Sequence, residues 1–122
     1  MAFVKSTSTI SSNSVTVSGL SGGTNGKVVR ISAANTAADA ANTDTSLQLQ
    51  SVLIKINDVY YSSGVVSGFT GLSPGSPYYL AADGNLTPTP PSPSSSVRVL
   101  FMGFALNTTD LLMRVGTPIS GT

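Results

Sequence analysis

The chain has 122 residues, the size of one ordinary domain, and only 9% of them are charged, against about 25% in a typical soluble domain. The net charge of +1 argues against a protein that binds nucleic acid or an anionic membrane surface through its charge. Histidine and cysteine are absent, which excludes imidazole and thiolate metal sites, catalysis by either side chain, and disulfides. Because 40% of the residues are hydrophobic, we expect a folded protein. We also expect no cofactor.

Residues 1–14 are rich in serine and threonine, and their apolar anchors are Phe3, Val4 and Ile10. So few apolar side chains do not offset the roughly 1–2 kcal/mol per residue that ordering a backbone costs. We therefore expect an N-terminal arm that adds a strand to the sheet edge of a partner. The alternative is that Phe3 and Val4 start an edge strand of the same domain.

Alternating apolar residues predict strands in the first half of the chain. Residues 15–17 and 27–31 alternate, and the Asn-Gly pair at 25–26 predicts a hairpin turn between them. The alanine-rich stretch 33–45 has no large apolar residue at helical spacing, so we expect a loop with at most a short helical turn.

A second alternating run covers residues 47–56. Its inward-facing apolar residues have odd numbers before Ser51 and even numbers after it. One extra residue in a bulge would absorb that change, so we expect a bulged strand. Asn57-Asp58 interrupts the run before residues 59–61 resume it, which predicts a hairpin.

The second half follows a similar plan. Residues 78–81 predict a strand, and the Asp-Gly pair at 83–84 predicts a hairpin turn. Residues 87–96 contain four prolines, which cannot donate to a sheet, so we expect an extended, solvated connection.

Residues 97–106 form the most apolar predicted strand. A turn at residues 107–110 connects it to a predicted partner strand over residues 111–115. Strict alternation gives it two apolar faces, with Val97, Val99, Phe101 and Ala105 on one and Leu100, Met102, Phe104 and Leu106 on the other. A lone small antiparallel domain usually leaves one face of each sheet in water. A strand that is apolar on both faces therefore indicates that a second surface is covered, as in an oligomer.

These elements predict an all-β fold, a small antiparallel sandwich or barrel with long polar loops and an N-terminal arm. We expect a single β domain over residues 15–116, built from two similar halves at about 15–70 and 71–116. Residues 117–122 form a tail in this interpretation. The longest apolar run, 97–106, is too short for a membrane span and contains an arginine, so we expect no membrane insertion.

The acidic groups are five aspartates in predicted turns: Asp39, Asp44, Asp58, Asp83 and Asp110. A pair such as Asp39 and Asp44 suits a calcium site or a glycosidase, but aspartate in turns commonly hydrogen-bonds the local backbone instead. A nucleophilic serine would need a lysine as its base, and no Ser-x-x-Lys spacing is present. We therefore expect no enzymatic activity and no metal site.

Two tyrosine pairs, at 60–61 and 78–79, lie on predicted strands, so one ring of each pair should face the core and the other the surface. Four rings on one platform would stack sugars, which keeps a carbohydrate-binding module open as an alternative function. The candidate partner-interface residues are Phe3, Val4, Ile10, Tyr60, Tyr61, Tyr78, Tyr79 and Phe104.

The last 50 residues or so resemble a β module of tailed-bacteriophage virion proteins. The resemblance is carried by residues 71–80 (Gly-Leu-Ser-Pro-Gly-Ser-Pro-Tyr-Tyr-Leu), 87–92 (Thr-Pro-Thr-Pro-Pro-Ser), 97–106 and 111–115. Those modules share a Gly-Leu-x-Pro-Gly-x-x-Tyr-Tyr-Leu motif, a Thr-Pro-Pro linker and two final apolar strands. Met102-Gly103-Phe104 departs from the lighter apolar run of the family. The first half matches by pattern alone.

The resemblance implies a non-enzymatic structural protein of a bacteriophage particle, located on the outer surface of the capsid or tail. A short β protein with a polar arm suits a capsid decoration or cement protein, which binds the shell and stabilises contacts between capsid subunits. The implied partners are the chain itself, as a homotrimer, and the major capsid protein or another virion protein. A tail-fibre or neck component is the alternative within the same family.

Overall fold

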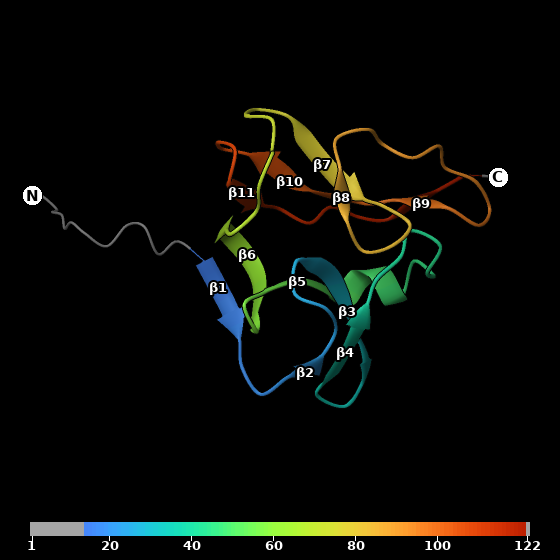
Figure 1. Cartoon of the computed structure of the whole chain (residues 1–122). Helices are drawn as coiled ribbons and strands as arrows, with labels where there is room; N and C mark the ends of the chain where they lie inside the picture. Colours follow the sequence, from blue (N-terminus) through green and yellow to red (C-terminus); the bar gives the residue numbers. More distant parts are fainter. Residues whose placement is uncertain (1–13, 122) are drawn as a thin grey trace, which may run out of the picture.

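The computed structural model describes residues 14–121, and its regular structure is almost entirely β, which confirms the predicted fold class (Figure 1). The strands are β1 (Ser14–Val17), β2 (Ser21–Gly22), β3 (Lys27–Ala33), β4 (Thr36–Asp39), β5 (Val52–Ile56), β6 (Val59–Ser67), β7 (Pro77–Leu80), β8 (Leu86–Thr87), β9 (Arg98–Val99), β10 (Phe101–Ala105), β11 (Asp110–Met113) and β12 (Ile119–Ser120). One 3-10 helix, η2 (Gln48–Ser51), precedes β5. Within this part of the chain, no helix is long and apolar enough to cross a membrane.

Ten of the described strands form one sheet in the order β2-β4-β3-β5-β6-β11-β10-β7-β8, with β1 also paired to β6. All of these pairs are antiparallel except β2–β4, which is parallel. The strands β9 and β12 pair with each other in a separate small sheet. Residues 119–120 therefore lie in a strand, within the segment predicted as a tail.

The long strand β6 joins two layers. Its start pairs with β5 and its end with β11, while Gly64 in its middle pairs with both Ser14 of β1 and Met113 of β11. Since β1 and β11 meet the same residue from opposite edges, β5 and β11 share one edge of β6. The first layer comprises β1 to β5 with the start of β6, and the second comprises the end of β6 with β11, β10, β7 and β8 (Figure 1).

The main core lies between these layers. Each layer contributes fully buried aliphatic side chains, and the most deeply buried large ones are Val28, Leu49, Ile54, Val66, Leu80, Leu100, Met102, Leu111 and Met113. Their burial supplies the largest favourable contribution to folding, about 1.5–3 kcal/mol for each large side chain.

A smaller second core lies on the other face of the first layer. It contains Val29, Ala37, Leu53 and Tyr60, with the partly buried Leu20 packed against them. The first layer thus has apolar residues on both faces, which explains why all five residues of β5 are buried. The segment from β1 to β2 curls over this face, because β1 pairs with β6 on one side of the layer and β2 pairs with β4 on the other (Figure 1).

A buried lysine and a buried tyrosine hold that curl in place. The Nζ of Lys55 donates to the carbonyl oxygens of Gly22 and Gly23, both at 3.1 Å, and lies 5.2 Å from the centroid of the Tyr60 ring. The Tyr60 hydroxyl donates to the same Gly22 oxygen at 2.7 Å. The charge of Lys55 is therefore compensated by backbone oxygens, and by the Asp58 carboxylate 3.9 Å away.

The prediction of a loop over residues 33–45 is wrong in part, because it contains β4. A turn with Asn35 at φ 53° leads from β3 into β4, which then pairs with β3 on one edge and β2 on the other. Alanine has little intrinsic preference for strands, but pairing on both edges outweighs it. The small Ala37 side chain fits the tight second core.

The predicted bulge near Ser51 is also wrong. The switch of the inward-facing residues from odd to even positions comes from the helical turn η2. Thr45 and Gln48 exchange hydrogen bonds: the Thr45 hydroxyl accepts from the Gln48 backbone N–H at 3.2 Å, and Gln48 Oε1 accepts from the Thr45 N–H at 2.9 Å. This is the reciprocal geometry of a helix capping box. The turn leaves Leu47 exposed and buries Leu49 completely.

The predicted hairpins have mixed outcomes. The turns at 57–58, 83–84 and 107–110 connect paired antiparallel strands, as expected. Asn25-Gly26 forms a turn but no hairpin, because the strand before it, β2, pairs with β4 rather than with β3. The connection over residues 88–96 contains no strand, in agreement with its prolines.

A bulge at Gly103 changes which side chains of β10 share a face. Register shifts between Phe101 and Gly103 in the pairing with β7, and Gly103 has a φ of 148°. Leu100, Met102 and Ala105 therefore all reach the main core, and Phe101 and Phe104 lie on the other side. The strict alternation predicted for 97–106 is wrong beyond the bulge.

We expect Gly103→Ala to destabilise the fold by roughly 2 kcal/mol or more, because an added Cβ would overlap the Leu112 carbonyl and the φ disfavours a side chain. Urea unfolding at 25 °C measures the change. Gly116→Ala is the control, since its Cβ would meet the Phe101 Cβ at an ordinary 3.5 Å, and its loss should stay well below that of Gly103→Ala. Equal losses would contradict the role of the bulge.

We expect Tyr60→Phe to lower the free energy of unfolding by about 1 kcal/mol, because it removes the hydrogen bond to Gly22 and keeps the ring. Tyr79→Phe is the matched control, because the Tyr79 hydroxyl makes no hydrogen bond to the described residues. Its stability should equal that of the unmodified chain in the same urea titration. A silent Tyr60→Phe would show that Lys55 alone holds the curl.

Candidate functional site

The structure separates the four candidate tyrosines. Tyr60 lies in the second core and Tyr61 packs against the main core, so both rings of this pair face apolar interior, because the first layer has a core on each face. Tyr78 is buried, and its hydroxyl oxygen accepts a 2.8 Å hydrogen bond from the Ser73 N–H. Tyr79 is half-buried on the outer face. The one-in, one-out prediction is thus right for the second pair and wrong for the first.

Two of the candidate interface residues are corrected by this burial. Tyr60 and Tyr78 are 4% and 5% exposed, so neither offers a ring to a partner, and a platform of four stacking rings does not form. Phe3, Val4 and Ile10 lie outside the described residues, and their predicted role stays a prediction. Tyr79 and Phe104 remain as surface candidates.

Tyr79 and Phe104 belong to an apolar band across the outer face of the second layer. Directly paired residues of antiparallel strands share a face, and the register pairs Tyr79 with Phe101, Phe104 with Leu112, and Leu112 with Val65. All five are half-buried, and none packs against the main core. We call these residues the outer band: Val65, Tyr79, Phe101, Phe104 and Leu112.

Contacts between neighbours give the outer band a defined shape. The rings of Tyr79 and Phe101 meet edge to face, with centroids 5.8 Å apart and planes at 67°. The Arg114 guanidinium lies 5.7 Å from the centroid of the Phe104 ring, the one cation–π contact on this band. Because this sheet is apolar on both faces, its outer side has the composition of a protein–protein contact.

A second apolar surface lies at the edge of the second core. A groove of about 440 Å³ opens beside Leu53, between the end of β1 and the end of β3. We call it the second-core groove, and its lining residues are Val17, Leu20, Ile31, Asn35, Gln50, Ser51, Val52 and Leu53. Val17 and Ile31 at its rim are 38% and 36% exposed. The groove is open to solvent, and five of its eight lining residues are apolar.

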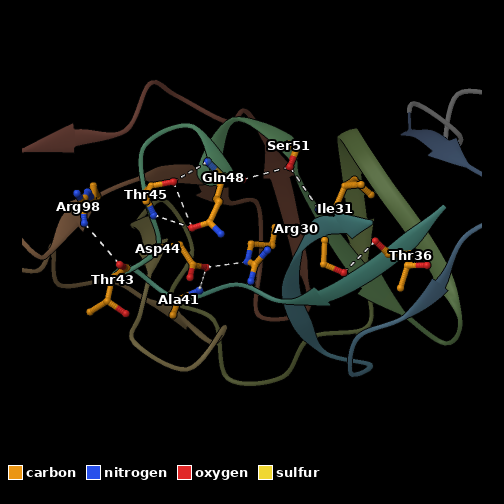
Figure 2. A network of polar contacts seen from close by, with 11 residues as sticks. Arg30, Ile31, Thr36, Ala41, Thr43, Asp44, Thr45, Gln48, Ser51 and Arg98 are labelled. Carbon is orange, nitrogen blue, oxygen red and sulfur yellow. Dashed lines mark hydrogen bonds and ion pairs between the residues drawn. The ribbon is translucent and has the colours of Figure 1, made fainter. Parts of the chain in front are cut away.

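The most connected polar cluster surrounds the loop between β4 and η2 (Figure 2). Asp44 accepts a hydrogen bond from the Ala41 N–H at 2.8 Å and pairs with Arg30 Nε at 3.2 Å. Arg98, from β9, reaches the Thr43 carbonyl oxygen at 3.5 Å. These groups hold the loop against β3 and β9.

The other aspartates also have structural partners. Asp39 accepts hydrogen bonds from both the backbone and the hydroxyl of Thr24, so it is engaged separately from Asp44. A hydrogen bond from the Asn85 backbone lowers the pKa of the exposed Asp83 carboxyl, and one from the Asn107 amide lowers the pKa of Asp110. In residues 14–121 no group of three or more acidic side chains is placed to hold a metal ion.

Sequence reasoning missed most members of both surfaces. Phe101 shares a face with Phe104 because of the Gly103 bulge, whose signal is a glycine in the middle of an apolar strand. Leu112 lies opposite Phe104 through the regular pairing of β10 with β11. The second-core groove depends on how β1 and β2 curl, which no local pattern encodes. With this geometry in view, comparison with known proteins identifies no relative: no family model, no curated protein and no solved structure matches the chain.

Proposed function

We propose that this chain is a non-enzymatic structural protein of a bacteriophage particle, a capsid decoration or cement protein that binds the shell and stabilises contacts between capsid subunits. The observation that carries the proposal is the outer band, which makes the second layer apolar on both faces. The resemblance of residues 71–115 to phage virion modules supplies the setting.

The chemistry of the surface supports a role in packing rather than catalysis. The described aspartates, together with Arg30 and Arg98, hold turns and loops, and the clusters they form present no catalytic pair. Interfaces of permanent assemblies are apolar and poor in charge, and a chain with 9% charged residues has that composition throughout. A carbohydrate-binding role loses its main support, since two of the four tyrosines are buried.

The direct test is to locate the chain on particles. Tailed-phage particles from a strain that encodes the chain are purified, and their proteins are identified by mass spectrometry. Image reconstruction should then show the domain on the outer surface of the capsid. Density on a tail fibre or neck would instead establish the alternative within the same setting, and absence of the chain from particles would contradict the proposal.

We expect Phe104→Ala to weaken binding to particles that lack the protein by at least about ten-fold, because it removes the largest apolar side chain at the centre of the outer band. Co-sedimentation with particles measures the affinity. Leu106→Ala is the control, since Leu106 is 46% exposed, lies two residues away and is outside the band. Similar binding by both variants would exclude the outer band as the contact.

We also expect the purified chain to self-associate as a trimer, with a mass in light scattering of about three times the 12.4 kDa of one chain. Self-association is expected because neither the outer band nor the second-core groove is covered by the described part of one chain, and the resemblance to phage virion proteins implies three copies. A monomer at micromolar concentration would contradict this expectation.

A further inference from the structure

Among the described residues, apolar surface stays exposed at the edge of the second core. The partly buried Leu20 packs against its four buried residues, and the second-core groove opens beside them. Val17 and Ile31 expose more than a third of their surface at the rim, next to the buried Leu53. An apolar side chain inserted here would remove this surface from water, at about 25 cal/mol per Å².

We propose that the second-core groove binds the N-terminal arm, residues 1–13, of a second copy of this chain. The inference rests on the proposed function to the extent that both require self-association. It adds that the arm of one copy occupies the second-core groove of another copy.

The arm has the chemistry that this groove selects. Phe3 and Val4 are adjacent and Ile10 follows, and the residues between them are mostly serine and threonine. Apolar anchors of this kind fill the space between Val17, Ile31 and Leu53. The exposed amides of Asn35 and Gln50 at the rim offer donors and acceptors to the backbone of an extended peptide.

The path of the chain favours an arm from a second copy over the chain's own arm. The chain enters β1 at Ser14, which pairs with Gly64, whereas the groove lies at the opposite end of β1, where Val17 pairs with Tyr60. The chain's own arm would have to reverse at Ser14 and run back along the whole of β1. Thirteen extended residues span up to about 43 Å, which is long enough to reach the groove of a neighbouring copy.

A mixing experiment with full-length chains tests the exchange. The arm variant carries Phe3→Ser and Val4→Ser, and the groove variant carries Ile31→Asp. Each alone should self-associate at least ten-fold more weakly in analytical ultracentrifugation. An equimolar mixture should form heterodimers, because the intact arm of the groove variant fits the intact groove of the arm variant. Ile119→Asp is the control, since Ile119 is 59% exposed in β12 and should leave association unchanged.

Cysteine cross-linking identifies whose arm occupies the groove, and the chain contains no native cysteine to confuse the result. Differently tagged chains carrying Lys5→Cys or Gln50→Cys should form a disulfide between the two tags on mild oxidation. Replacing Gln50→Cys by Ser95→Cys, in the distant proline-rich connection, should abolish it. A disulfide formed only within one chain that carries both substitutions, or none at all, would overturn the proposal.

The outcomes separate this inference from the proposed function. If the chain lies on particles but Ile31→Asp associates as tightly as the unmodified chain, the groove is excluded and the structural role stands. If the cross-link between copies forms but particles lack the chain, the arm exchange stands and the role in the virion fails.

Discussion

The shared strand β6 is the constraint on which the rest of the structure depends. Its start belongs to the first layer and its end to the second, so the two layers cannot slide or rotate independently. The residues that seal the main core from either side, such as Ile54 and Leu111, are brought opposite each other by this one strand. Gly64, at φ 89°, allows the strand to change direction between its two sets of partners.

Most of the few charged side chains in the described part of the chain hold its own turns and loops together. Asp39 holds the turn at Thr24, Asp44 holds the loop after β4, and Lys55 holds the curl of β1 and β2. Each of these side chains hydrogen-bonds the backbone of a loop or turn, in place of water. What remains for interaction with other molecules is therefore apolar shape, at the outer band and the second-core groove, rather than charge.

The elements whose signals are local were predictable from the sequence. Turn residues at 57–58 and 83–84 placed hairpins correctly, and the prolines marked the long connection. The Thr45–Gln48 capping box was also a local signal, and it was overlooked in favour of alternation. The strand β4 was not predictable in the same way, because its alanines have little intrinsic preference for strands and it is held by pairing with β3 on one edge and β2 on the other.

The candidate site illustrates the same limit. Strict alternation predicts that Phe104 shares the face of Met102, but Phe104 lies on the opposite face because alternation does not account for the bulge at Gly103. The tyrosines at 60–61 were expected on opposite sides of a sheet with one core, and the first layer has two. Both errors arise from tertiary context. Which face each residue takes, and whether that face is buried, depends on pairing and packing that the alternating pattern does not contain.

The position of β1 and β2 has a consequence for how the chain folds. The pairs β3–β4, β5–β6, β7–β8 and β10–β11 join neighbours in sequence, but Val15 meets Ser62 across 47 residues and Gly22 meets Tyr60 across 38. Closing long loops is slow, so we expect the local hairpins to form before the long-range pairings of β6 with β1 and with β11. On the ribosome, the first strands made must wait for β6 to emerge. During that interval the edge of β6 is open to the N-terminal strand of any neighbouring chain, so crowded synthesis favours strand-exchanged assemblies.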